Sequence, residues 1–442
     1  MLQNLTLLHP KHRNPWTWIP LLYMAKGLPY VTLMTLSLFV FKRMGMENGD
    51  IVLYTSLFLF PWVIKPLWRP LIDLYRTRRF WIFSTEAVIV LALTGVAWSV
   101  SKPDSMNTTM LCFWLLAFGS ASHDTAVDSF YQLGVLPSKR MKMVPVRRFF
   151  YRLTMVLVQG VVVMMAGNLE VLTRNVRYSW STVIYLIAAV FLCLFVANML
   201  LLPHPADRIV RRSEMSVNRL KRVFKANINT FVRKPHARVA IAFLLVYLLA
   251  EGMMAKVALL FLIDRSSIGG LGLSPQEFGF VQGTVGVFAL VSGGMIGNRL
   301  VHRIGLKRCL WPMAAALTLP KLAFVYLAFS MPEGLSAISS CLFLEQFGLG
   351  FGMTAYIMFL VYFSQGERVA AHYGIGIALM SLSLMLSGVF SGICAELFGY
   401  RTFFIVVLLM GLLTFFVTFL VKVPPSFGME ITKKRAFPDI KE

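Results

Sequence analysis

Twelve apolar stretches, each about twenty residues or longer, follow one another along this chain of 442 residues. A helix crosses a bilayer core about 30 Å thick with about 20 apolar residues. Lipid offers the backbone no hydrogen bonds, so only helices and closed barrels can span it. The pattern predicts an all-α membrane protein with twelve transmembrane helices. The expected spans are residues 16–41, 51–72, 80–101, 109–133, 149–169, 179–202, 238–262, 276–298, 309–330, 336–362, 373–395 and 402–422.

The composition leaves too little polar surface for a soluble protein of this length. Hydrophobic residues make up 57% of the chain and charged residues 14%, and the mean hydropathy is +0.69. The net charge of +23 would suggest a nucleic-acid partner in a soluble domain. Here Lys and Arg are about four times as numerous in one set of alternate loops and termini as in the other, which is the positive-inside bias. We therefore expect no nucleic-acid partner and two cytoplasmic termini.

The polar segments carry no signature of catalysis. The five cysteines are scattered within or beside the apolar stretches, without the spacing of a metal site or a redox pair. The loops contain no nucleotide-binding motif or paired carboxylates, and none is large enough for a catalytic domain. The sequence thus predicts a protein that has neither metal nor cofactor and is not an enzyme.

A polar, basic interval divides the twelve stretches into two sets of six. We expect an N-terminal bundle over residues 1–202, a cytoplasmic linker over 203–237, and a C-terminal bundle with a cytoplasmic tail over 238–442. Within the linker, residues 217–231 combine apolar and basic side chains. They could form an amphipathic helix on the anionic inner leaflet, or belong to a solvated linker.

Short matches between the two sets indicate an internal duplication. Residues 25–27 (AKG) correspond to residues 250–252 (AEG), and residues 118–119 (FG) correspond to residues 347–348 (FG). One short insertion reconciles the two registers. A parallel duplication of six spans resembles the plan of the major facilitator superfamily, in which two bundles rock around a central site. The resemblance implies two pseudo-symmetric six-helix bundles with the major facilitator fold.

The loops after the second and eighth stretches strengthen this resemblance. The family's loop signature is an Asp followed by a basic residue within a Gly-rich, basic segment; here His302 replaces the Asp before Arg303. The first copy keeps Asp73 with Arg76 and Arg79. Asp73 could face a helix N-terminus, whose positive dipole end favours an anion, and so latch the bundles together. The alternative is an ordinary basic cytoplasmic loop.

Ionisable residues inside the apolar stretches are candidates for a transport pathway, because they are costly in lipid unless they face a cavity or a partner. Lys26 and Glu251 lie near the middles of the first and seventh stretches. In the superfamily that the chain resembles, helices 1, 4, 7 and 10 line the cavity. Lys26 and Glu251 could pair across the halves and part when an anionic substrate takes the lysine. A permanent ion pair is the alternative, although Glu251 and Lys256 have an imperfect spacing for one.

The fourth stretch carries three candidate proton carriers, His123, Asp124 and Asp128. The two aspartates are four residues apart and therefore share one helical face. A carboxylate in a low-dielectric cavity binds protons more readily and can exchange them near neutral pH, as a proton-coupled carrier requires. Asp128 could instead pair with Arg148 or Arg152 as a structural clamp.

The tenth stretch carries Glu345 and Gln346, followed by alternate glycines that allow close helix approach. Glu345 could be a second proton site, bind an amine of the substrate, or bond to a neighbouring helix. Tyr30 could stack against a sugar ring or serve in packing. The expected substrate-binding residues are Lys26, Tyr30, Glu251, Lys256, Glu345 and Gln346.

Three segments resemble the AmpG branch of this superfamily, the muropeptide permeases of bacterial inner membranes. They are residues 26–30 (KGLPY), 65–73 (KPLWRPLID) and 122–128 (SHDTAVD). The second half, including residues 269–274 and 348–352, resembles AmpG-type carriers of the Bacteroidetes type. The resemblance implies proton-driven import of anhydro-muropeptides through a cavity wide enough for a disaccharide with a short peptide.

Lys26 stands where members of this branch commonly have Gln. The cargo's carboxylates could meet this lysine, and its charge could shift the preference toward a more anionic cargo. The branch also resembles acetyl-CoA carriers, so another anionic metabolite is an alternative cargo, and a non-transporting membrane sensor is a further alternative. We expect a monomeric, proton-coupled importer of peptidoglycan fragments in the inner membrane. Its partners would be the lipid bilayer, protons and an anionic sugar-peptide.

Overall fold

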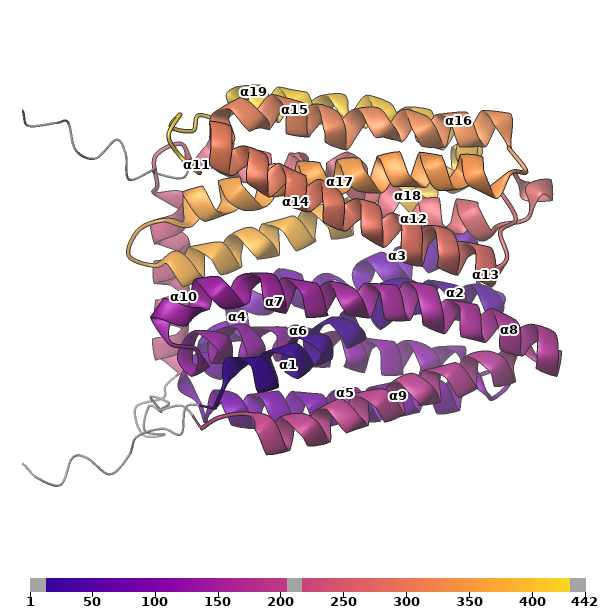
Figure 1. Cartoon of the computed structure of the whole chain (residues 1–442), viewed down its shortest axis with the longest axis horizontal. Helices are drawn as coiled ribbons and strands as arrows, with labels where there is room; N and C mark the ends of the chain where they lie inside the picture. The colour runs from indigo at the N-terminus through magenta and orange to yellow at the C-terminus, as the bar shows by residue number, and fades with distance from the viewer. Residues whose placement is uncertain (1–12, 205–216, 430–442) are drawn as a thin grey trace, which may run out of the picture.

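The computed structural model describes residues 13–204 and 217–429, and these residues form helices and connecting loops without a strand (Figure 1). The first elements are α1 (Pro15–Val31), η1 (Thr32–Leu36), α2 (Ser37–Arg43), α3 (Asn48–Leu57), α4 (Phe60–Leu74), α5 (Arg78–Val100), α6 (Met106–Gly134), α7 (Pro137–Met155), η2 (Val156–Val162), α8 (Val163–Thr173) and α9 (Val176–Leu201). The later elements are α10 (Val217–Val232), α11 (Ala237–Val246), α12 (Leu249–Ile263), η4 (Ser266–Ile268), α13 (Pro275–Phe278), η5 (Gly279–Gly286), α14 (Val287–Ile304), α15 (Leu306–Thr318), η6 (Leu319–Lys321), α16 (Leu322–Ser330), α17 (Leu335–Ser364), α18 (Val369–Met410) and α19 (Leu412–Leu420).

Ten helical segments of the described chain are long and apolar enough to cross a membrane. One of them, Val369–Leu420, has 52 residues and contains a bend at Gly399, whose φ of +67° favours glycine. The predicted span over residues 109–133 lies in α6, which has 29 residues but is not one of the ten. Ionisable side chains in the middle of α6 lower its hydropathy, and this explains the difference from the prediction.

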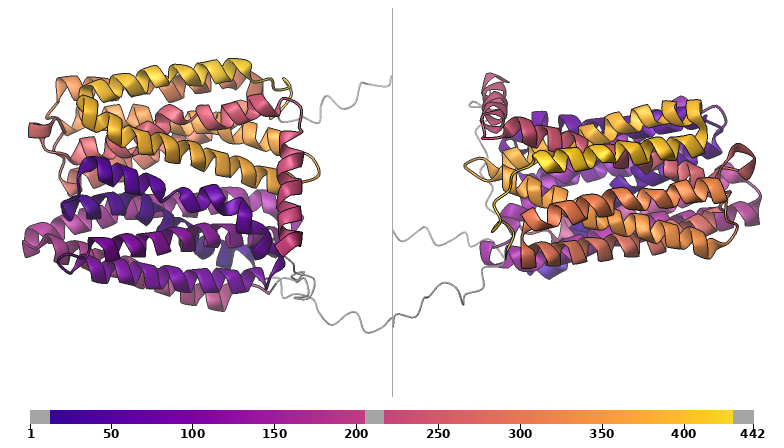
Figure 2. Two further views of the ribbon diagram at one scale, coloured as in Figure 1. Left: turned by 180° about the vertical axis from the view of Figure 1, so that it is seen from behind. Right: turned by 90° about the horizontal axis from the view of Figure 1, so that it is seen from above.

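The long helices lie nearly side by side in two groups. Elements α1 to α9 form one group and α11 to α19 the other, and α10 lies crosswise at one end of both (Figures 1 and 2). The N-terminal end of α1 and the C-terminal end of α19 lie at that same end. We refer to the contact between the groups as the seam, to the groups as the N-terminal and C-terminal halves, and to the two ends as the α10 end and the opposite end.

The outer surface of the helices is apolar. Large side chains such as Leu172, Leu111 and Phe288 are 79%, 69% and 66% exposed, and many more resemble them. Soluble monomers rarely expose apolar patches of this extent, whereas a lipid-facing surface requires them. The structure therefore supports the embedding in a bilayer that the hydropathy pattern predicts.

Two π-helical segments meet at the seam. Segment η2 from the N-terminal half packs on η5 from the C-terminal half, and both contain glycines at the contact. A Cβ added to Gly283 would lie 2.3 Å from the Cα of Gly160. The two backbones are therefore in direct contact, which only glycine permits at this position.

Helix α10 corresponds to the amphipathic helix that residues 217–231 predict. Its apolar face packs on α4, α11 and α18, and Phe231 is 2% exposed against the rings of Phe363 and His372. Arg368 donates to the side-chain oxygen of Asn227 at 2.7 Å. The apolar face thus lies on protein and contacts both halves, while the rest of the predicted linker lies partly outside the described residues.

Candidate functional site

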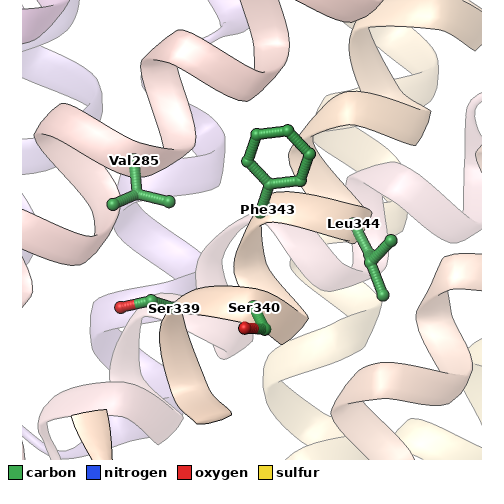
Figure 3. Close-up of a pocket in the computed structure, with 5 residues that line it drawn as sticks. All are labelled: Val285, Ser339, Ser340, Phe343 and Leu344. Carbon is green, nitrogen blue, oxygen red and sulfur yellow. The ribbon is translucent and has the colours of Figure 1, made fainter. Parts of the chain in front are cut away.

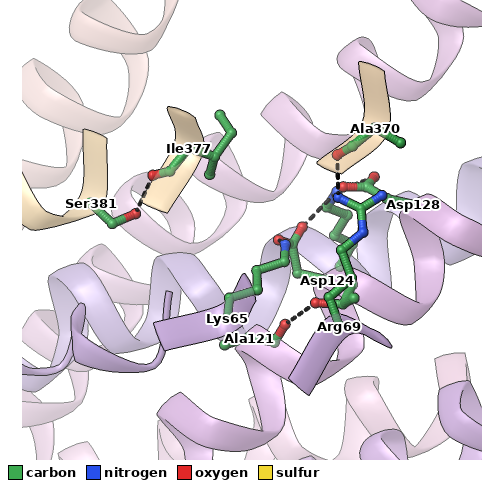
Figure 4. Close-up of polar contacts among 10 residues, drawn as sticks. Lys65, Arg69, Ala121, Asp124, Asp128, Ala370, Ile377 and Ser381 are labelled. Atoms are coloured by element: carbon green, nitrogen blue, oxygen red, sulfur yellow. Dashed lines mark hydrogen bonds and ion pairs between the residues drawn. The ribbon is translucent and has the colours of Figure 1, made fainter. Parts of the chain in front are cut away.

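Two lysines and two aspartates form a compact ionic cluster in the N-terminal half. The ammonium of Lys26 in α1 lies 2.6 Å from a carboxylate oxygen of Asp124 and 2.6 Å from one of Asp128, both in α6. Lys65 of α4 bonds to the other carboxylate oxygen of Asp124 (Figure 4). We call these four residues the Lys26 cluster. Three of the side chains are less than 20% exposed, and Asp128 is 43% exposed.

The cluster replaces two of the pairings that the sequence suggested. Lys26 does not pair with Glu251, because α6 brings two carboxylates to it within the same half. Asp128 pairs with Lys26 and not with Arg148 or Arg152. The four formal charges of the cluster sum to zero when both aspartates are ionised, which is how buried charges are tolerated.

A second buried group of charges lies in the C-terminal half. Lys321 of η6 donates to Glu251 of α12 at 2.8 Å. Glu345 of α17 is 5% exposed, accepts a hydrogen bond from Gln346 at 2.8 Å, and lies within electrostatic range of Glu251 and Lys321. Sequence reasoning missed Lys321, although a lysine inside the apolar stretch 309–330 was a sufficient signal.

Lys256 reaches across the seam, and among the described residues it has no acidic partner. Its ammonium donates to the backbone carbonyl of Met34 at 2.6 Å, and Met34 belongs to the π-helical segment η1 of the N-terminal half. Lys256 and Glu251 lie five residues apart on α12, so they point in directions about 140° apart around the helix axis. The pair that their sequence proximity suggested therefore does not form.

His123 lies away from the Lys26 cluster. It is fully buried and its ring nitrogen lies 3.3 Å from Glu86 of α5, which also accepts from Asn198 of α9 at 2.7 Å. Tyr30, by contrast, lies near the cluster, within electrostatic range of Asp124. Its ring makes an edge contact with Trp62, with the centroids 5.3 Å apart.

The gating residues expected near the second stretch contact their own half. Asp73 accepts from Ser129 of α6 at 2.7 Å and pairs with Arg69 one turn away at 3.5 Å. Arg76 lies over aromatic rings, and Arg79 donates to the carbonyl of Met199 at 2.7 Å. Among the residues of the two described ranges, Asp73 contacts no helix N-terminus across the seam.

Arg69 makes the crossing contact that we had expected of Asp73. Its guanidinium donates to the carbonyl of Ala370 in α18 at 2.9 Å (Figure 4). In the second copy of the loop, a ring nitrogen of His302 lies 3.1 Å from the carbonyl of Gly428, and Arg303 is exposed. The α10 end of the seam is therefore tied by Arg69.

The opposite end of the seam is tied by Asp264, which sequence reasoning did not single out. This fully buried carboxylate, at the end of α12, lies 2.5 Å from the ammonium of Lys42 and accepts from Asn48 at 2.6 Å. Tyr400 of its own half donates to it at 2.5 Å. Glu396 accepts from the backbone amide of Gly49 at 2.8 Å. Polar contacts thus join the halves at both ends.

A pocket of about 390 Å³ lies in the C-terminal half, and none of its lining residues belongs to either charged group. Its lining is mostly apolar (Figure 3), and consists of Val285, Ser339, Ser340, Phe343 and Leu344. Leu344 is 56% exposed on the outer surface, which places the pocket toward lipid. The candidate site is accordingly the pair of charged groups, and not this pocket.

A helical body with many apolar spans and ionised side chains buried in each half has the architecture of a membrane transporter. The comparisons with known proteins agree. The chain belongs to the Major Facilitator Superfamily, whose family model matches residues 21–366.

Its relatives include named permeases. The anhydromuropeptide permease of Escherichia coli K12 is 25% identical over 371 residues, which cover 82% of this chain and 71% of the relative. The putative transporter AmpG 3 of Rickettsia prowazekii is 22% identical, covering 80% of this chain and 84% of the relative. The crystal structure of the nucleoside transporter NupG superposes with a TM-score of 0.69 at 15% identity, covering 93% of this chain and all of that one.

Proposed function

We propose that this protein is a proton-coupled secondary transporter that imports peptidoglycan fragments, anhydro-muropeptides, across the inner membrane by alternating access. The observation that carries the proposal is the Lys26 cluster, in which two carboxylates and two ammonium groups are held together inside a membrane-spanning half. The similarity to the anhydromuropeptide permease supports the class of cargo.

The charge balance of the cluster links proton binding to cargo binding. With both aspartates ionised, two positive and two negative charges cancel. A proton on Asp128, which is the most exposed of the four groups, leaves the cluster with a charge of +1. An anionic cargo is then attracted, and departure of the proton on the other side of the membrane lowers the affinity again. By linkage, the cargo favours the protonated state to the same extent.

Asp124 has a different role in this scheme. It is held by Lys26 and Lys65 at once, so it joins α1, α4 and α6 and transmits the charge state of Lys26 to α4. Glu345 is the proposed second proton site, since it is buried beside Glu251 and no cation pairs with it among the described residues. Tyr30, Lys256 and Gln346 complete the proposed substrate site, while His123 is the least favoured proton carrier because it faces Glu86.

The topology that we propose has twelve crossings, with both termini in the cytoplasm. The bend at Gly399 would divide the 52-residue segment into two spans, and α6 would add the twelfth. The proposed halves are residues 1–202 and 238–442, joined by a cytoplasmic linker, and the protein would act as a monomer. The α10 end would then be cytoplasmic.

Alternating access would open the seam at one end at a time. Asp264 with Lys42 would hold the outer end closed, and Arg69 with Ala370 would hold the inner end. The loop residues that flank the inner end are proposed to assist this gating. They are Asp73, Arg76, Arg79, His302 and Arg303.

Uptake into proteoliposomes tests the proposal. The parent should accumulate a radiolabelled anhydro-muropeptide when an inward proton gradient is imposed. Asp124→Asn should weaken the dependence on the gradient, because the charged link between Lys26 and Lys65 is lost and the charge state of Lys26 no longer reaches α4. Lys26→Gln should change the relative uptake of anionic and neutral cargo while expression is preserved.

The same assay separates the alternatives. Accumulation of a nucleotide thioester instead of the muropeptide would favour a carrier of another anionic metabolite, a possibility that the charge of Lys26 keeps open. No flux of any of these compounds would favour the sensor. If both variants transport like the parent under the gradient, the Lys26 cluster is not the coupling site.

A further inference from the structure

Helix α7 carries three arginines where it approaches the seam. Arg148 and Arg152 are four residues apart and so share one face of the helix, and Arg147 lies beside them. Within residues 13–204 and 217–429, none of the three forms an ion pair with a carboxylate. Arg147 lies within electrostatic range of Asp128. The charges of Arg148 and Arg152 are not neutralised by any described carboxylate in their surroundings.

Arg152 lies against the opposite half. One of its terminal nitrogens, Nη2, is 4.0 Å from the position that a Cβ on Gly294 of α14 would occupy. The other, Nη1, is buried and has no hydrogen-bond partner among the described residues. A buried donor on a charged group is expensive to leave unsatisfied. The guanidinium thus offers unused donors at the boundary between the halves.

Arg148 and Arg147 differ in their surroundings. Arg147 donates to the hydroxyl of Tyr23 at 3.4 Å. The Cζ atom of its guanidinium lies 4.8 Å from the ring centroid of Tyr131, so its guanidinium is already in contact with two aromatic side chains. Arg148 is exposed and lies within electrostatic range of Tyr373 of α18. Tyr373 is also in range of Lys26 and Asp128. Arg148 and the Lys26 cluster therefore lie near the same side chain, Tyr373.

The balance of charge in this space favours an anion at the arginines. Lys26 and Lys65 are already bonded to Asp124 and Asp128, whereas Arg148 and Arg152 lack acidic partners in the described part of the chain. A guanidinium can bind a carboxylate through two parallel hydrogen bonds, and two guanidinium groups one helical turn apart can hold it from both sides.

We propose that Arg148 and Arg152 form the carboxylate-binding site for the cargo, in place of Lys26. This rests on the proposed function, because it requires a cargo that carries a carboxylate. The Lys26 cluster would then set the net charge near the arginines when a proton binds Asp128, while the arginine pair of α7 recognises the anion directly at the seam.

Binding of two matched probes to the purified protein in nanodiscs tests this site. One probe is an anhydro-muropeptide whose peptide ends in a free carboxylate, and the other is the same molecule with a terminal carboxamide. Arg148→Gln and Arg152→Gln should each weaken binding of the carboxylate probe by about tenfold or more, since hydrogen bonds between charged groups are the strong ones. Binding of the carboxamide probe should change less than about twofold. Arg152→Lys should recover part of the loss, because it keeps the charge but not the planar fork.

The exposed Arg233, beyond the end of α10, supplies a control that alters the net charge equally. Arg233→Gln should bind both probes like the parent. Equal weakening of both probes, or no weakening of either, by the two glutamine variants would overturn the arginine site while leaving the proposed function intact. A parent that binds neither probe would overturn the proposed cargo itself. If Arg152→Gln does not fold, the exposed Arg148→Gln carries the same discrimination.

Discussion

Lys321 and Glu251 are buried together in the C-terminal half, with side-chain exposures of 2% and 10%. Their ion pair lies beside Glu345, another buried carboxyl group. Removing two charges from water is costly, and their attraction offsets that cost only while both are present. The pair therefore stabilises the half chiefly by preventing an unpaired charge.

Substitution of Lys321 alone should expose this dependence. Lys321→Met leaves Glu251 unpaired next to Glu345, so we expect it to lower the free energy of unfolding by about 3–5 kcal/mol. The double variant with Glu251→Gln should regain most of that loss. Unfolding titrations in mixed detergent micelles measure both. If the single and double variants are equally destabilised, the charge balance at this position is not what matters.

Three π-helical segments, η1, η2 and η5, interrupt long helices of both halves. Such segments are rare and are frequently found at functional sites. Here η1 presents the Met34 carbonyl to Lys256, while η2 and η5 bring the halves into backbone contact. The regular helices supply the spans, and the π segments add contacts across the seam near its middle to those that Arg69 and Asp264 make at its ends.

The glycine contact between η2 and η5 predicts a position-specific sensitivity. In Gly283→Ala the new methyl would meet the backbone of Gly160 at 2.3 Å, so the halves must separate locally, at a typical cost of about 1–3 kcal/mol. Gly286 lies in the same segment, but a Cβ there would make only an ordinary contact of 3.4 Å with Gln346. Thermal unfolding and proteoliposome uptake should both be impaired in Gly283→Ala and nearly unchanged in Gly286→Ala. Equal behaviour of the two variants would contradict a tight contact at this point of the seam.

At the scale of the whole molecule, the halves are joined by polar contacts at both ends of the seam. Asp264 collects Lys42, Asn48 and Tyr400 at one end, and Arg69 reaches α18 at the other. An ion pair such as Asp264–Lys42, or a hydrogen bond such as Arg69–Ala370, can be broken and remade without repacking a core. The proposed alternating access requires this property at each end of the seam.

Asp264→Asn should loosen the end opposite α10, because it removes the charge that holds Lys42. Spin labels on Thr173→Cys, at the end of α8, and Ser266→Cys, two residues after Asp264, report the separation of the halves once the five native cysteines are replaced. Both positions are exposed. The distance distribution measured by electron resonance should gain a longer component. Glu277→Gln is a matched control, since Glu277 caps its own helix and crosses no seam. A distribution that stays unchanged in Asp264→Asn would show that other contacts close this end.

Hydropathy and charge predict much of this architecture. The apolar stretches coincide with long helices, the amphipathic linker helix is present as α10, and the superfamily inferred from the duplication is the one that the chain belongs to. Lys26, Asp124, Glu251 and Glu345 all lie buried in groups of charge. These features depend on the chain's local pattern, which the sequence displays directly.

The partners of these charged residues could not be predicted from the local sequence pattern. Sequence separation does not identify the partner of Lys26, because every candidate lies on another helix, and only packing selects Asp124 and Asp128 over Glu251. Lys321 is visible as a lysine inside an apolar stretch, but its pairing with Glu251 is not. Asp264 carries no motif, and the π segments have no periodicity that distinguishes them from α-helix. The whole-chain topology, with its number of crossings and its orientation, stays a prediction.

Segment η1 also sets the rotational phase between the two ends of its helix. Lys26 lies before it and Lys42 after it, so the same membrane span carries one group of the charged cluster and one group of the Asp264 contact. Removing a single residue from η1 would turn everything downstream by about 100° around the axis. Lys42 would then point away from Asp264, while Lys26 would still face Asp124 and Asp128. The π-helical turn thus sets the angle between Lys26 and Lys42 around the helix axis, so that each lysine faces its own carboxylate partner. If η1 were one residue shorter, the two ion pairs could not both form.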